Sequence, residues 1–317
     1  ISCSLVGSEM CIRDSTNHDG LTNSQVGAIL KDTRGYIWFG TQSGLCRFDG
    51  FRMKTFYYIN TDDKSLPNNS VDELQQDYGG NIWVHTSVGY CIYKYDEEQF
   101  ERKPEEWLKN IHVQGPPYKL LIDKDKNMWI AVYGQGLYYH NAKTKNTYLF
   151  KFTKKAQPGC LKEGNISKIT EVDGDALITY GDGTICRVNG QKQKVLWYNS
   201  FLATHKAAGD NGAYTFYDGI GGFWLSVSNA NYVYQSKTGK WTDARSYLTN
   251  MGIDIPCPTR ILMRDIARDK AGNLWVASDH NGLFFVDFKR KICRQYVHSE
   301  AKGSIVDNSL QKVYVDD

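Results

Sequence analysis

Short segments of alternating apolar and polar residues, separated by clusters of turn-forming residues, run along most of this chain. In residues 66–101, a loop rich in Pro and Asn comes first, and Asp77-Tyr78-Gly79-Gly80 forms a tight turn between two alternating segments. Asp can bond its own downstream amides, and Gly adopts positive φ without a Cβ clash. The pattern predicts four strands, at 71–76, 82–84, 90–95 and 99–101.

The turn belongs to a repeated motif, Asp-x-x-Gly-x-apolar-Trp. Its aspartates are Asp32, Asp77, Asp123, Asp218 and Asp269, its turn glycines are Gly35, Gly80, Gly221 and Gly272, and its tryptophans are Trp38, Trp83, Trp129, Trp224 and Trp275. Successive tryptophans are 45, 46, 95 and 51 residues apart, and the gap of 95 is close to two periods with one Trp missing. Periods of this length are typical of propellers, solenoids or arrays.

Four short antiparallel strands at this period predict an all-β fold, a β-propeller of four-stranded blades. We expect six blades, at 21–59, 66–101, 117–151, 165–199, 212–242 and 260–298. A seventh begins near Leu310 and stops, so the fold class is a truncated seven-bladed propeller, although eight blades remain open. In blade 4 a hairpin turn at Asp173-Gly174 replaces the longer turn, and Leu177 or Ile178 takes the Trp position.

The repeated Asp and Gly residues are expected to form turns, and each Trp is expected to fill the gap between neighbouring sheets. The alternative is that the tryptophans form a sugar-binding platform. Because the same residue recurs at the same internal position of each copy, we favour the structural role.

The two ends of the sequence depart from the repeat. Residues 1–15 match no part of it and resemble translated adapter sequence of metagenomic reading frames, so we expect a non-native leader. Residues 16–317 form a single propeller domain, incomplete at the C-terminus, because the sequence stops where the next motif is due. No stretch reaches the roughly 18 apolar residues of a membrane span.

Composition excludes some classes of partner and cofactor. The net charge of +3 is small, and no basic run is interleaved with aromatic residues, so we expect no nucleic-acid binding by this segment. Cys46, Cys91 and Cys186 share one repeat position and are predicted to be buried thiols rather than disulfide partners. No metal-ligand spacing is present, so neither a metal nor another cofactor is expected.

Residues 21–50, LTNSQVGAILKDTRGYIWFGTQSGLCRFDG, resemble the two-component regulator propeller repeat at almost every position. Residues 66–96 resemble it well and 260–288 moderately. The resemblance implies the periplasmic sensor region of a hybrid two-component system histidine kinase, anchored in the inner membrane by a helix outside this sequence. It implies a glycan-derived oligosaccharide ligand, a second propeller and a β-sandwich domain in the full-length chain, and a possible homodimer.

Two other classes of function remain as alternatives. A secreted propeller glycosidase or polysaccharide lyase would need paired carboxylates. Most acids of the chain occupy the repeated turn, and only Asp182 and Asp279 depart from it. We therefore predict no catalytic residues and no enzyme. A non-catalytic interaction scaffold is the other alternative.

Ligand sites of propellers form where loops of several blades converge on one face. The turns between second and third strands share a face with the connections between blades, so we predict the ligand site among polar and aromatic residues near those turns that break the repeat. These are His85, Tyr133, Gln135, Asp182, Asn229, Asp279, His280 and Asn281. Tyr133 with Asp279 or His280 would combine an aromatic face with hydrogen-bonding groups.

Overall fold

The computed structural model describes residues 20–154, 160–199, 214–227, 230–256, 261–301 and 304–316, together with the backbone of 3–5 and 13–15. The latter two segments, β1 (Cys3–Leu5) and β2 (Arg13–Ser15), pair in a two-stranded antiparallel sheet. The non-native origin of residues 1–15 stays a prediction.

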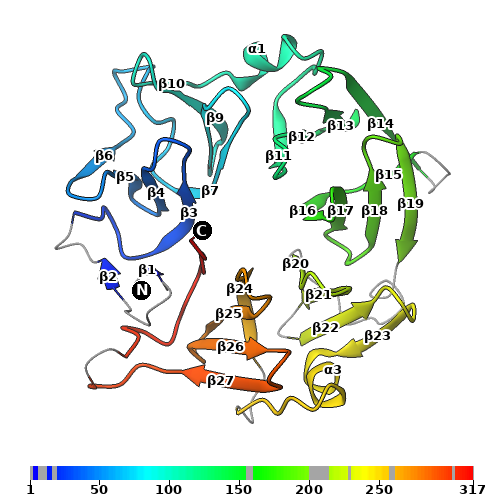
Figure 1. The fold of residues 1–317 in the computed structure, drawn as a ribbon. Coiled ribbons are helices and arrows are strands. Elements are labelled where there is room, and N and C mark those ends of the chain that lie inside the picture. The colour runs from blue at the N-terminus through cyan, green and yellow to red at the C-terminus, as the bar shows by residue number, and fades with distance from the viewer. Residues whose placement is uncertain are drawn as a thin grey trace. The chain divides into compact units, whose positions relative to one another are not determined.

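Six larger sheets account for the other described strands, and each presents four consecutive strands in antiparallel order (Figure 1). These are the four-stranded blades of an all-β propeller, which confirms the predicted fold class. The chain divides into two compact units, which are described separately below.

Unit 1 comprises Ile1–Tyr57, Asn69–Glu73 and Phe216–Asp317 and contains blades 1, 5 and 6. The strands of blade 1 are β3 (Val26–Lys31), β4 (Ile37–Thr41), β5 (Gly44–Phe48) and β6 (Met53–Phe56). Those of blade 5 are β20 (Tyr214–Tyr217), β21 (Gly222–Val227), β22 (Ala230–Gln235) and β23 (Lys240–Asp243). Those of blade 6 are β24 (Leu262–Arg268), β25 (Leu274–Asp279), β26 (Leu283–Asp287) and β27 (Ile292–Tyr296).

Unit 2 comprises Tyr58–Asn68 and Leu74–Thr215 and contains blades 3 and 4 and all of blade 2 except the first half of β7. Blade 2 consists of β7 (Val71–Gln76), β8 (Ile82–Thr86), β9 (Gly89–Lys94) and β10 (Gln99–Glu101). Blade 3 consists of β11 (Pro117–Ile122), β12 (Met128–Val132), β13 (Gly136–His140) and β14 (Thr147–Thr153). Blade 4 consists of β16 (Ile166–Val172), β17 (Asp175–Tyr180), β18 (Ile185–Asn189) and β19 (Lys194–Asn199).

The repeated aspartate does more than form a turn. One oxygen of Asp77 accepts the backbone N–H groups of Gly79 and Asn81 at 2.8 and 3.0 Å, and the other accepts the indole N–H of Trp83 at 3.0 Å. The same Asp-to-Trp hydrogen bond, six residues apart, occurs in all five copies at 2.7–3.4 Å. The turn and the interior of the blade are therefore joined through one carboxylate.

Four of the tryptophan rings, those of Trp83, Trp129, Trp224 and Trp275, pack against the next element along the chain, as predicted. Trp83 of blade 2 lies in a cluster with Met128 and Ile130 of blade 3, and Trp129 of blade 3 lies with Ile166 and Ile178 of blade 4. All five rings are buried. A large aromatic ring buried between two sheets contributes a large apolar contact area to the packing of neighbouring blades.

Two short helices support this packing. Helix α1 (Pro104–Lys109) follows blade 2 and places Trp107 edge-on to Trp83, with ring centroids 5.3 Å apart. Helix α3 (Ala244–Asn250) follows blade 5, and its Tyr247 lies edge-on to Trp224 and donates a hydrogen bond to Asp218. The sequence pattern did not predict either helix, nor the short strand β15 (Leu161–Lys162), which pairs with β14 in parallel.

Blade 4 replaces the Asp–Trp motif, as predicted. Asp173 and Gly174 form the turn with φ of 51° and 83°. Leu177 lies opposite Arg187, as Trp38 lies opposite Arg47 in blade 1, so Leu177 and not Ile178 takes the Trp position. No indole is present there, and an ion pair between Arg187 and Asp175 at 2.6 Å takes its place.

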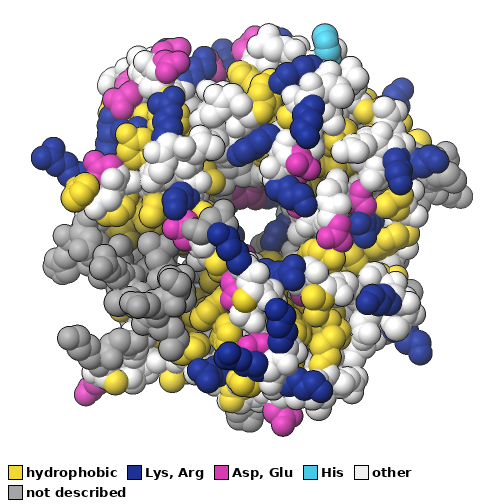
Figure 2. Space-filling model, in the orientation of Figure 1, with side chains coloured by type: hydrophobic (Ala, Val, Ile, Leu, Met, Phe, Trp, Pro, Cys, Tyr) yellow, Lys and Arg dark blue, Asp and Glu magenta, His cyan; other side chains and the backbone are white. Residues whose placement is uncertain are grey.

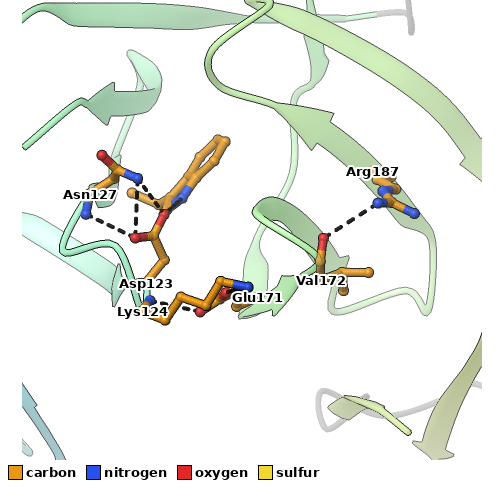
Figure 3. A network of polar contacts seen from close by, with 7 residues as sticks. Asp123, Lys124, Asn127, Glu171, Val172 and Arg187 are labelled. Atoms are coloured by element: carbon orange, nitrogen blue, oxygen red, sulfur yellow. Dashed lines mark hydrogen bonds and ion pairs between the residues drawn. The ribbon is translucent and has the colours of Figure 1, made fainter. Parts of the chain in front are cut away.

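Polar side chains connect neighbouring blades of unit 2 at the Asp turns (Figure 3). Beside the Asp123–Trp129 hydrogen bond, Glu171 of blade 4 accepts the backbone N–H of Lys124 at 2.8 Å and pairs with the Lys124 ammonium at 3.5 Å. Gln75 of blade 2 bonds the backbone of blade 3 at Leu120 and Ile122. The innermost strands are thus bridged as well as packed.

The segment after blade 6 lies against that blade. Leu310, Val313 and Val315 pack with Trp275, and Lys312 pairs with Asp265 at 3.8 Å. Among residues 304–316 no regular strand forms, so the seventh blade stays a prediction.

The described cysteines include Cys46, Cys91 and Cys186, which are buried free thiols, as predicted. Burial raises the pKa of each of these three thiols. Within the described ranges, no helix is long and apolar enough to cross a membrane.

Charged side chains of both signs are interspersed over the face of the molecule seen in Figure 2. This distribution agrees with the small net charge of +3.

One buried histidine links pH to the contact between blades 2 and 3. Thr147 Oγ1 donates to Ile111 O at 2.6 Å, so it accepts from His140 Nδ1 at 2.9 Å. His140 Nε2 is buried without a partner. Burial, together with the nearby charges of Lys145 and His112, lowers the pKa of His140.

The first prediction concerns the Asp turn of blade 3. Asp123→Asn presents an amide that cannot accept all of the hydrogen bonds made by the carboxylate, including that of the Trp129 indole. We expect unfolding free energy to fall by roughly 2 kcal/mol, measured by urea denaturation. Asp125→Asn, at an exposed position of the same turn, is the matched control and should change stability by less than about 0.5 kcal/mol. Equal effects of both substitutions would contradict the role of Asp123.

The second prediction concerns pH. The pKa of His140 is lower in the folded chain than in the unfolded chain. As the pH drops below about 6.5, the unfolded chain therefore takes up a proton on this residue before the folded chain does, and the free energy of unfolding decreases. Melting temperatures measured between pH 7.5 and 5 should show this decline. His140→Phe should make the decline shallower whatever its effect on absolute stability, whereas His280→Gln, at a residue whose side chain is 83% exposed, should leave it unchanged.

Candidate functional site

The predicted site residues fall at or beside the turns between second and third strands, in both units. His85, Tyr133, Gln135 and Asp182 belong to unit 2, and Asp279, His280 and Asn281 belong to unit 1. Asn229 lies outside the described residues.

Tyr133 is an exposed aromatic surface with a rigid support. It lies in the turn between β12 and β13, 69% exposed, and stacks on Tyr118 with ring centroids 3.9 Å apart and an angle of 17° between planes. Burial raises the pKa of Tyr118 to about 12, although a hydrogen bond with the Ile166 backbone opposes the shift. Tyr118 therefore connects the exposed ring of blade 3 to the first strand of blade 4.

Gln135 anchors the same turn through its side chain. Its side-chain amide donates to Gln114 O at 2.8 Å, and its carbonyl accepts from the Tyr138 hydroxyl. Gly136 follows at φ +150°, where a Cβ atom would lie 2.1 Å from Phe150 O. The turn that presents Tyr133 therefore requires glycine and is anchored on both sides.

A charged pair lies at the corresponding turn of blade 4. Lys162 Nζ lies 2.6 Å from Asp182 Oδ2, and Asp182 Oδ1 accepts the backbone N–H of Thr184 at 2.9 Å. The side chains of Lys162 and Asp182 are 36% and 45% exposed. Partial burial would raise the pKa of Asp182, but the hydrogen bonds from Lys162 and Thr184 outweigh it and hold that pKa below its ordinary value. The pKa of Asp182 thus favours its carboxylate form, and both side chains are partly accessible to solvent.

Tyr180 lies beneath the charged pair and was not predicted. It occupies the position of Thr41, whose hydroxyl donates to the carbonyl of its own turn at 2.8 Å. The longer Tyr180 side chain packs between blades 3 and 4 instead, and its hydroxyl is buried without a partner. Lys162 Nζ lies 5.8 Å from the centre of its ring. The substitution of tyrosine at a Thr position was a sequence signal for this departure.

Five residues of unit 2 are here called the platform: Tyr133, Lys162 and Asp182 are exposed or partly exposed, and Tyr118 and Tyr180 support them from below. Tyr118 packs against the cluster that contains Ile166 and Tyr180, these two residues lie opposite each other in the sheet, and Lys162 of the charged pair lies over the Tyr180 ring. The platform presents an aromatic face, a hydrogen-bond donor and an acceptor. Tyr118 and Lys162 were missed because their roles depend on contacts between blades.

His85 lies within β8 rather than in a turn. It takes the strand position held by Gly40 in blade 1, and its ring lies 4.5 Å from that of Tyr90. The Tyr90 hydroxyl in turn accepts the backbone N–H of Leu120 at 3.1 Å. These contacts assign His85 to the packing between blades 2 and 3.

The candidates in unit 1 include a residue that contacts the segment after blade 6. Asp279 accepts hydrogen bonds from Ser309 and pairs with Arg264, and these contacts hold its pKa below the ordinary value. His280 Nε2 lies 3.5 Å from Asp279, at a residue with φ of 69°. The backbone carbonyl of Asn281 accepts from Gln295. Asp279 therefore anchors the segment after blade 6.

No group of three or more His, Cys, Asp or Glu residues with metal-binding geometry occurs among the described residues. The platform offers stacking and hydrogen bonding.

A family model matches part of the chain. Residues 20–43 match the family model described as two component regulator propeller. No curated protein matches the sequence significantly.

Several solved structures share the fold. The extracellular domain assigned to the hybrid two component system BT3049 of B. thetaiotaomicron is similar, with TM-score 0.67 and 20% identity over 96% of this chain and 39% of that one. The corresponding domain of BT4673 from the same organism has TM-score 0.55 and 17% identity over 91% and 37%. PorZ, a surface component of the type-IX secretion system of Porphyromonas gingivalis, has TM-score 0.54 and 12% identity over 94% and 35%.

The chain thus spans about two fifths of the length of these structures or less, and the likeness establishes the fold. The family model matches the repeat of blade 1, and the same Asp–Trp turn motif occurs in four further blades of this propeller.

Proposed function

We propose that this propeller is a ligand-sensing part of the extracellular region of a hybrid two-component system, and that it binds a glycan-derived oligosaccharide at the platform. The observation that carries the proposal is the Tyr133 ring, exposed and held in place by stacking on Tyr118. A sugar ring can lay its C–H face on such a surface while its hydroxyls bond neighbouring polar groups. The match to the regulator propeller repeat supports a sensor role.

The sensor role implies a location and further domains. A hybrid sensor of this kind would place the propeller in the periplasm, followed by a second propeller and a β-sandwich domain, with homodimerisation as a means of signalling. The likeness in fold to extracellular domains from B. thetaiotaomicron supports this arrangement.

A non-catalytic role fits the two acids that break the repeat better than glycoside cleavage does. A general acid needs a raised pKa. The pKa values of Asp182 and Asp279 are both lowered, because each carboxylate accepts hydrogen bonds and pairs with a cation. These contacts disfavour a general acid at both positions.

The third prediction tests ligand binding. Isothermal titration calorimetry of the purified chain against a panel of neutral and acidic oligosaccharides should yield at least one ligand. Tyr133→Ala should weaken its binding by roughly 10- to 100-fold, because one stacked aromatic contact is lost. The control is Phe51→Ala, which removes a 94% exposed ring from a turn of blade 1 and should leave the affinity unchanged. Failure of every oligosaccharide in the panel to bind would overturn the proposal.

A further inference from the structure

The Lys162–Asp182 pair is built to stay together at the surface. Lys162 is fixed through its backbone N–H, which donates to the Tyr198 hydroxyl at 3.1 Å, and that hydroxyl donates to Cys160 O at 2.8 Å. Asp182 is fixed by the Thr184 N–H. The two charged groups lie 2.6 Å apart, so a ligand that reaches one of them also reaches the other.

The pair as a unit carries no net charge. A lone lysine beside an aromatic surface would attract carboxylate or sulfate groups of an acidic sugar. Here an acidic group that approaches Lys162 also approaches the Asp182 carboxylate, so attraction and repulsion nearly cancel. A neutral sugar loses nothing from this arrangement, because one hydroxyl can accept from the ammonium while its neighbour donates to the carboxylate.

The pair also has little value as a source of stability. Ion pairs between partly exposed side chains contribute about 0–1 kcal/mol, since solvent screens them and ordering the side chains costs entropy. The pair lies next to the ring of Tyr180, whose buried hydroxyl has no hydrogen-bond partner, and it is therefore part of the platform. The two adjacent charges can instead serve in the recognition of a ligand.

We propose that Lys162 and Asp182 determine specificity for uncharged sugars: they bond adjacent hydroxyls of a neutral sugar ring that stacks on Tyr133, and they disfavour uronic acids and sulfated sugars. This inference rests on the proposed function and deepens it, because it assigns the chemical class of the ligand. The alternative is that exposed lysines such as Lys151 and Lys154 determine the local charge and attract acidic sugars.

The fourth prediction compares matched ligands that differ in charge alone. The probes are β-1,4-gluco-oligosaccharides and their C6-oxidised counterparts, and α-1,4-galacto- and galacturono-oligosaccharides, each titrated by calorimetry. The wild-type chain should bind the neutral member of a binding pair at least about tenfold more tightly. Asp182→Asn should shift the ratio toward the acidic member by roughly tenfold, because Lys162 is left with an uncompensated charge.

Glu163→Gln is the matched control. It changes the net charge of the chain by the same amount next to Lys162, at an exposed residue, and leaves the ion pair intact. It should not shift the preference. Circular dichroism of both variants verifies that they fold.

The outcomes separate the two proposals. Tighter binding of acidic sugars by the wild-type chain, or equal shifts in Asp182→Asn and Glu163→Gln, would overturn the specificity role while the platform still binds sugar. If no probe and no other oligosaccharide binds, the proposed function fails and this inference fails with it.

Discussion

The hydrogen bond between a turn aspartate and the indole of a tryptophan six residues later is the interaction on which this structure depends. A large ring between two sheets supplies contact area, but its N–H group would be costly to bury alone. The aspartate accepts that N–H with one oxygen and orders its own turn with the other. One aspartate thus accepts hydrogen bonds from both the buried indole and the backbone of the turn. Repetition of the motif gives blades that pack in the same way.

Where the sequence departs from the Asp–Trp motif, the local structure differs from that of the other blades. Where tryptophan is absent, in blade 4, Arg187 and Asp175 supply a local ion pair, and Tyr180 replaces a small hydroxyl residue. That larger side chain fills the space between blades 3 and 4 and lies beneath the Lys162–Asp182 pair. The platform therefore lies where the regular blade geometry is interrupted.

The candidate site shows how similar residues at turns acquire different roles. Tyr133 and Asp182 are exposed at their turns, whereas Asp279 is occupied by Ser309 and Arg264, and Gln135 by Gln114 and Tyr138. All four break the repeat in the sequence. Their separate roles follow from partners that are distant along the chain, such as Ser309 for Asp279, and no local pattern encodes these partners.

The sequence by itself determined the fold class, the span of each of the six blades, the strands of blade 2 and the structural role of the tryptophans, because period, turn chemistry and alternation are local properties that the copies repeat. It also predicted that Asp173-Gly174 forms the turn of blade 4. The tertiary structure decided that Leu177 takes the Trp position, that helices α1 and α3 cover two of the tryptophans, and that Tyr118 supports Tyr133. These features depend on contacts between different strands and helices, which bring together residues that no sequence spacing relates.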